Sequence, residues 1–164
     1  MSDPDFSTFE VWRRGRQFED FEVGQTFEHH WGRTITAGDA TLFSSTALRY
    51  SPLYVNAEYA RSEGHDDLVV DPLLVLATVI GLSVEDLSEI GGPFLGVNDV
   101  QFEVPVYPGD TVTCRSEVKD TRESESRPDT GIVTWATEAV NQRGDVVLRY
   151  QRTNLVAKRR GGRS

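Results

Sequence analysis

Residues 70–82 read VDPLLVLATVIGL and form the only long apolar run in the chain that also carries a helix start signal. Asp71 is a good N-cap residue, because its carboxylate can accept a hydrogen bond from a backbone N–H one or two residues further on. Pro72 suits the first helical position, where the missing N–H costs nothing. Nearly every residue from 73 to 80 is apolar. The pattern predicts a helix that is buried on all sides and too short to cross a bilayer, which needs roughly 20 apolar residues.

The composition is that of one globular domain with a sizeable core, since the chain has 164 residues of which 38% are hydrophobic. A net charge of −9 argues against nucleic acid and anionic membrane surfaces as partners. Cys114 is the single cysteine, so no internal disulfide forms, and we expect a core thiol in a reducing compartment. The polar, acidic start does not resemble a signal peptide. We therefore expect a cytoplasmic protein.

Before the central helix, the sequence predicts an arm, a strand and a capped helix. Residues 1–20 carry four aromatic residues among acidic ones and are expected to pack on the domain or on a second subunit. Residues 26–35 alternate in part and predict a strand. Thr36 or Asp39 is expected to cap a helix that Pro52 ends, because the residue before a proline avoids helical dihedral angles.

The second half of the chain predicts antiparallel strands, at 94–104, 111–118, 131–140 and 146–156. One buried helix followed by four such strands, with 26–35 adding another, indicates an α+β fold in which a sheet curls around the helix. The domain is expected to span residues 21–158, with a basic tail at 159–164. An open sheet edge is expected to pair with a second copy of the chain, which gives a homodimer or a larger homo-oligomer.

Four strings carry a resemblance to a known family: TITAGD (34–39), SPLYVN (51–56), FEVPVYPGDT (102–111) and VNQRG (140–144). With them, residues 20–158 resemble the MaoC-like dehydratase and hydratase family, which has the hot-dog fold, an antiparallel sheet wrapped around one long helix. GGPFLG (91–96) is most similar to its mesaconyl-CoA or itaconyl-CoA hydratase branch. The resemblance implies reversible addition of water to a 2-enoyl-CoA thioester, with no cofactor beyond the CoA of the substrate.

The family's usual site holds one water between an Asp and a His that lie five positions apart around an Asn-Pro pair. A backbone N–H at the start of the central helix polarises the thioester oxygen. In this sequence the Asp falls on Arg49, the Asn on Ser51 and the His on Tyr54. The usual glycine at the helix start falls on Pro72, so Leu73 or the next residue would have to donate to the oxyanion.

The substituted positions each have two interpretations. Tyr54 either donates a proton through its phenol or is a packed tyrosine at a helix break. Arg49 cannot act as a base, and it either clamps a substrate carboxylate or is a surface arginine. Ser51 and the Leu73 N–H complete the candidate substrate-binding set.

Two further residues are candidate bases. Asp71 is either only an N-cap or, if it is desolvated, a general base. His65 lies in the loop before the central helix and either activates water or is solvated. The three histidines have no metal-ligand spacing, so no metal site is expected.

The sequence therefore predicts a hydratase or dehydratase that acts on an acyl-CoA with a small branched or dicarboxylic acyl group. Two alternatives stay open. The loss of the Asp/His dyad favours a hot-dog subunit that binds acyl thioester without catalysis, and a thioesterase needs only a carboxylate near the helix start, such as Asp71.

Overall fold

A computed structural model describes residues 14–159 of the chain. The helices are α1 (Ala37–Thr46), α2 (Pro52–Val55), α3 (Ala57–Ser62), α4 (Pro72–Leu82) and α5 (Val84–Leu87), after a 3-10 turn at Phe18–Asp20. The strands are β1 (Thr26–Glu28), β2 (Arg33–Thr34), β3 (Phe94–Phe102), β4 (Thr111–Glu123), β5 (Thr130–Val140) and β6 (Val146–Ala157). All strand pairs are antiparallel. The order is β1–β4–β5–β6–β3, and β2 also pairs with β4.

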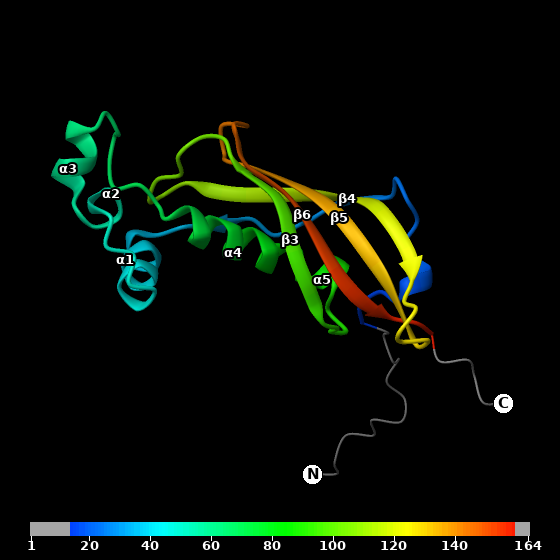
Figure 1. The fold of residues 1–164 in the computed structure, drawn as a ribbon. Helices are drawn as coiled ribbons and strands as arrows, with labels where there is room; N and C mark the ends of the chain where they lie inside the picture. Colours follow the sequence, from blue (N-terminus) through cyan, green and yellow to red (C-terminus); the bar gives the residue numbers. More distant parts are fainter. Residues whose placement is uncertain (1–13, 160–164) are drawn as a thin grey trace, which may run out of the picture.

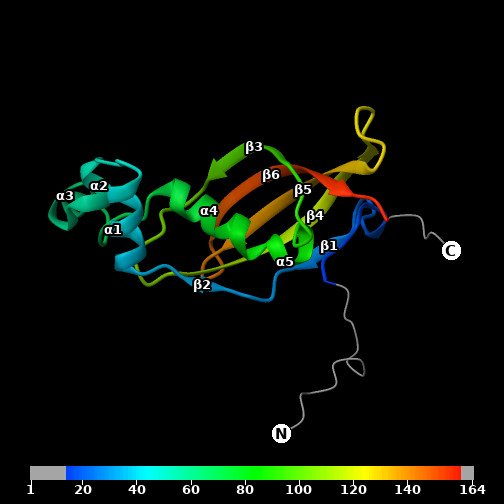
Figure 2. The same ribbon diagram turned by 90° about the horizontal axis from the view of Figure 1, so that it is seen from below.

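Helix α4 runs along one face of the curved sheet, and α1, α2 and α3 form a lobe beyond its amino end (Figure 1). Seen from below, α4 lies in front of the strands, and the described chain ends lie at the opposite end of the sheet from the lobe (Figure 2). This arrangement confirms the predicted hot-dog fold. No helix within residues 14–159 has the length and apolar character needed to cross a membrane.

The prediction that the central helix is buried on all sides is wrong for the single chain. Val75 and Val79 are the fully buried residues of α4, and they pack against the sheet. Leu73, on the opposite face, is 45% exposed. The physical reason is that the sheet covers one side of the helix only, so an apolar helix surface is left open.

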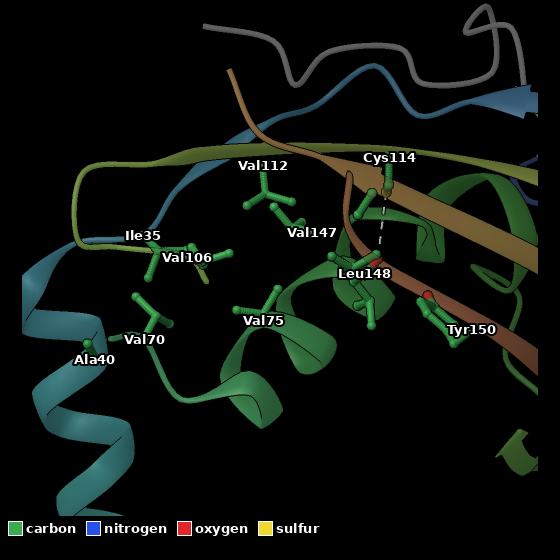
Figure 3. Packing of buried hydrophobic residues seen from close by; sticks show 12 residues of the cluster. Ile35, Ala40, Val70, Val75, Val106, Val112, Cys114, Val147, Leu148 and Tyr150 are labelled. Carbon is green, nitrogen blue, oxygen red and sulfur yellow. Dashed lines mark hydrogen bonds between the residues drawn. The ribbon is translucent and has the colours of Figure 1, made fainter. Parts of the chain in front are cut away.

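The core divides into two hydrophobic clusters. The larger one lies under α4 and includes Val75, Leu148 and Cys114 (Figure 3). Burial raises the pKa of the Cys114 thiol to about 12, which fits the predicted core thiol. The smaller cluster lies around Trp135 and Phe21.

A row of polar side chains separates the two clusters. His29 Nδ1 lies 2.8 Å from Asp86 Oδ2 in α5, and His29 Nε2 lies 2.9 Å from Ser116 Oγ in β4. Ser116 Oγ in turn lies 2.8 Å from Thr137 Oγ1 in β5. We call His29, Asp86, Ser116 and Thr137 the polar row. It satisfies buried polar groups that would otherwise destabilise the core.

Two local predictions differ from the structure. The predicted strand at 26–35 is two short strands, β1 and β2, which both pair with β4. Pro52 does not end a long helix: α1 already ends at Thr46, and Pro52 opens α2 at the first helical position. A proline fits a helix start as well as a helix stop, and the sequence alone did not separate the two.

The ends of the chain are described only in part. Phe18 packs on the smaller cluster, and its ring lies against the backbone of Gly131, where no side chain would fit. The other aromatic residues of the predicted arm, Phe6, Phe9 and Trp12, lie outside the described residues, as do residues 160–164 of the predicted tail.

Two of the family-like strings meet at one corner of the fold, and Asp110 joins them. Its carboxylate accepts hydrogen bonds from the Tyr107 N–H at 3.0 Å, from Gln142 at 2.6 Å and from Arg143 at 2.9 Å. Burial alone would raise the pKa of Asp110, but these donors hold it below its usual value. The two strings are thus joined by hydrogen bonds that hold the β3–β4 and β5–β6 turns together.

Candidate active site

The amino end of α4 is capped as the sequence predicts. Asp71 Oδ1 accepts a hydrogen bond from the Leu73 N–H at 2.8 Å, and Pro72 is the first helical residue. The Leu74 N–H donates to the Asp71 carbonyl at 2.9 Å. Pro72 has no N–H, so the first two amides of the helix both point to Asp71.

Arg49 pairs with the other oxygen of the same carboxylate. Its Nε lies 2.6 Å from Asp71 Oδ2. The Asp71 side chain is completely buried, whereas the Arg49 side chain is 41% exposed. The hydrogen bond to Asp71 and the charge of this carboxylate raise the pKa of Arg49. Arg49 Cζ lies 5.9 Å from the centroid of the Tyr54 ring, within the range of a cation–π contact.

The backbone before Arg49 is strained in a way that presents it to the helix. Leu48 has a φ of 55°, in the left-handed region that a leucine rarely adopts. The Arg49 N–H donates to the Ser44 carbonyl at 2.8 Å and closes the turn after α1. This conformation ends α1 and directs the chain toward Asp71. Strain of this kind is found at functional sites.

The structure brings together Arg49, Tyr54, Asp71 and the Leu73 N–H, which we call the α4 cap cluster. Ser51 lies beside the cluster, directly before α2, and its carbonyl accepts from the Tyr54 N–H at 3.0 Å. His65 lies elsewhere: its Nδ1 is 3.1 Å from the Tyr107 hydroxyl, and no hydrogen bond or ion pair within residues 14–159 joins it to the cap cluster. The proton-transfer roles of Tyr54, Asp71 and His65 remain predictions.

A groove of about 500 Å³ runs beside α4, on the face that the sheet leaves open. Its lining includes the apolar residues Trp31, Ile35, Leu74, Ala77 and Leu82 and the charged residues Arg33, Asp39 and Glu85. Leu74, next in sequence to Leu73 of the cap cluster, is the α4 residue nearest the amino end of the helix in this lining. A mostly apolar groove with a few polar groups is typical of a small-molecule site.

Sequence reasoning missed the pairing of His29 with Asp86. His29 is buried, and nothing in the sequence marks a partner 57 residues away. Residues 14–159 contain no group of three His, Cys, Asp or Glu side chains arranged to hold a metal ion.

The cap cluster has a direct consequence for stability. Replacing Asp71 with Ala is expected to lower the free energy of unfolding by about 1–2 kcal/mol, because the Leu73 N–H loses its acceptor. Asp71→Asn is expected to retain most of this stability, since asparagine caps helices nearly as well. Urea unfolding followed by circular dichroism measures both. Equal losses in the two variants would contradict the capping role.

The fold and the comparisons define the class: this is a MaoC-type hot-dog domain. The sequence model of the family described as mesaconyl-CoA hydratase matches residues 6–163. The chain belongs to this family. A mesaconyl-CoA hydratase of Haloarcula hispanica is 39% identical over 147 residues, and a beta-methylmalyl-CoA dehydratase of Chloroflexus aurantiacus is 39% identical over 145. These matches cover 89% and 88% of this chain but 41% of each relative.

Solved structures agree. A putative MaoC domain protein dehydratase from Chloroflexus aurantiacus superposes with a TM-score of 0.84 at 38% identity, over 89% of this chain and 41% of that one. A MaoC-like dehydratase from Rhodospirillum rubrum superposes with a TM-score of 0.79 at 27% identity, over 90% of this chain and 100% of that one. A Mycobacterium tuberculosis protein with a double hot-dog fold superposes with a TM-score of 0.82 at 22% identity, over 92% of this chain and 46% of that one. The chain thus spans about two fifths of the length of the curated relatives it matches.

Proposed function

We propose that the protein is a hydratase or dehydratase that interconverts a 2-enoyl-CoA and a 3-hydroxyacyl-CoA whose acyl group is branched or dicarboxylic. In the hydration direction, the water oxygen bonds to C3 of the acyl chain and a proton is added at C2. Membership of the mesaconyl-CoA hydratase family over residues 6–163 is the observation that carries the proposal. The site proposed is the cap cluster, with Tyr54 as proton donor or water ligand and Asp71 as base, and His65, which bonds Tyr107 outside the cluster, is the alternative base.

The proposal includes an assembly. Strand β3 is an edge strand, and it leaves Phe94, Leu95, Val100 and Phe102 between 37% and 52% exposed. An exposed apolar edge favours pairing with another strand. A second copy of the chain is the simplest partner, and relatives about twice as long are consistent with a second hot-dog domain at this edge. We further propose that the protein works in the cytoplasm and needs no cofactor.

A panel of thioesters tests the reaction. We expect mesaconyl-CoA to gain 18 Da on incubation with the protein, because water adds across its double bond, and a 3-hydroxyacyl-CoA to lose 18 Da in reverse. Mass spectrometry of the thioesters measures both changes. A saturated acyl-CoA without a 3-hydroxyl group serves as the control and is expected to stay unchanged. Release of free CoA instead of a hydrated thioester would support a thioesterase and contradict the proposal.

One observation favours the second candidate, a subunit that binds acyl thioester without turning it over. The Leu73 N–H, the predicted oxyanion donor, is already bonded to Asp71. Catalysis by this chain then requires the carboxylate to move or another amide to serve. Binding of mesaconyl-CoA without any 18 Da change, by the protein in its native assembly, would favour this second candidate.

A further inference from the structure

We propose that Arg49 is the residue that recognises the free carboxylate of the acyl group, and that Asp71 and Tyr54 are positioning residues that hold its guanidinium for this purpose. The inference rests on the proposed function only in taking an acyl-CoA thioester as the ligand. It names the specificity determinant of the cap cluster and assigns Asp71 a role other than that of a base.

The first argument is how the guanidinium is held. Only its Nε is used by Asp71, at 2.6 Å. Asp71 is itself fixed, because it is completely buried and its other oxygen caps α4. The Tyr54 ring stands 5.9 Å from Cζ. An arginine anchored through one nitrogen and an aromatic face loses little further freedom when it binds a second anion.

The second argument is that the terminal nitrogens of the Arg49 guanidinium can still donate hydrogen bonds. A guanidinium has five N–H donors in a planar fork, so an arginine bound through Nε keeps the edge formed by its two terminal nitrogens, which the Tyr54 side chain approaches without using all of its donors. In residues 14–159, Asp71 is the acidic side chain that pairs with Arg49. The arginine side chain is 41% exposed. This edge can receive a carboxylate by two parallel hydrogen bonds.

The third argument is the electrostatic setting. Asp71 neutralises the single charge of Arg49, and the amino end of the 11-residue helix α4 adds a partial positive charge. A second carboxylate here is therefore stabilised by this partial charge and by hydrogen bonds from the guanidinium. The groove beside α4 is lined mostly by apolar residues, Leu74 among them, so it suits the hydrocarbon part of a ligand and not its charge. An acyl chain that carries its own carboxylate meets both requirements.

The test is a binding measurement with two saturated thioesters that cannot be hydrated. 2-Methylsuccinyl-CoA carries a free carboxylate, and 2-methylbutyryl-CoA has a methyl group in its place. Isothermal titration of the native protein is expected to show tighter binding of the first. Arg49→Gln is expected to weaken binding of 2-methylsuccinyl-CoA by about tenfold or more and to change binding of 2-methylbutyryl-CoA by less than about twofold.

Three further variants separate positioning from charge. Arg49→Lys keeps the charge but loses the fork, so we expect an intermediate selectivity. Asp71→Asn keeps the helix cap and frees the guanidinium, and it is expected to reduce selectivity less than Arg49→Gln does. In the double variant, Asp71→Asn is expected to add nothing to Arg49→Gln, because it acts through Arg49. Arg61→Gln removes an arginine of the same lobe, paired with Glu58 and Asp67, and is the matched control.

The outcomes are distinct. If Arg49→Gln weakens both thioesters equally, the arginine contacts the phosphates of CoA and the inference is overturned. If it weakens neither, the arginine is structural and the inference is also overturned. If the native protein binds neither thioester, the proposed function fails, and this inference fails with it. Selective binding without hydration of mesaconyl-CoA would leave this inference standing and reject catalysis by the chain.

Discussion

Replacing Trp135 with alanine is expected to lower the free energy of unfolding by about 3–5 kcal/mol. The Trp135 side chain is completely buried in β5 and is the largest residue of the smaller cluster. Its ring centroid lies 5.2 Å from that of Phe21, and Arg152 Cζ lies 5.3 Å from it on another side. Removal of the Trp135 ring leaves a cavity, and the buried guanidinium of Arg152 loses its aromatic neighbour.

Urea unfolding of the two tryptophan variants checks this expectation. Trp31 is 62% exposed, so Trp31→Ala is the matched control and is expected to change the unfolding free energy by less than about 1 kcal/mol. A loss at Trp135 no greater than the loss at Trp31 would show that the smaller cluster is not packed as described.

The second large effect is expected at the edge strand. Val100→Lys is expected to weaken association of the chain with its partner by about a hundredfold, because pairing would bury an unpaired charge among apolar side chains. Val100 is 37% exposed in β3, near Phe102 and Val104, which line a small groove of about 260 Å³. Analytical ultracentrifugation over a concentration series measures the association.

Val23→Lys is the matched control for this experiment. Val23 is 65% exposed and lies in the turn before β1, at the other edge of the sheet. The same substitution there is expected to leave the association unchanged. If Val23→Lys dissociates the assembly and Val100→Lys does not, the subunits meet along the β1 edge and the proposed assembly is wrong.

Much of the fold could be predicted from local chemistry. Asp71 and Thr36 cap their helices as expected, because capping depends on residues one to three positions away. The four strands after α4 also follow from alternation along the chain. The predictions that were wrong concern packing between residues that are distant in the sequence. Burial of α4 on all sides was inferred from its own composition, whereas burial is decided by how far the sheet reaches.

The candidate site was predictable in part. Tyr54 lies in a family-like string, Arg49 stands where the family's Asp falls, and Asp71 is the predicted N-cap, and all three lie together at the amino end of α4. His65 was selected because it precedes the helix in sequence, but its loop turns it toward Tyr107. The direct bond between Arg49 and Asp71 was not anticipated, since it joins residues 22 positions apart that were assigned separate roles.

The corner held by Asp110 has a consequence for how such proteins are recognised. The string that most clearly marks the family ties two turns together, bonds His65 through the Tyr107 hydroxyl, and accepts the Val70 N–H at the Val106 carbonyl just before α4. Within residues 14–159 it makes no hydrogen bond or ion pair with Arg49, Tyr54, Asp71 or Leu73, so this signature does not depend on which side chains form the cap cluster. Membership inferred from the signature tells which architecture a chain inherits, and its reaction has to be established separately at the bench.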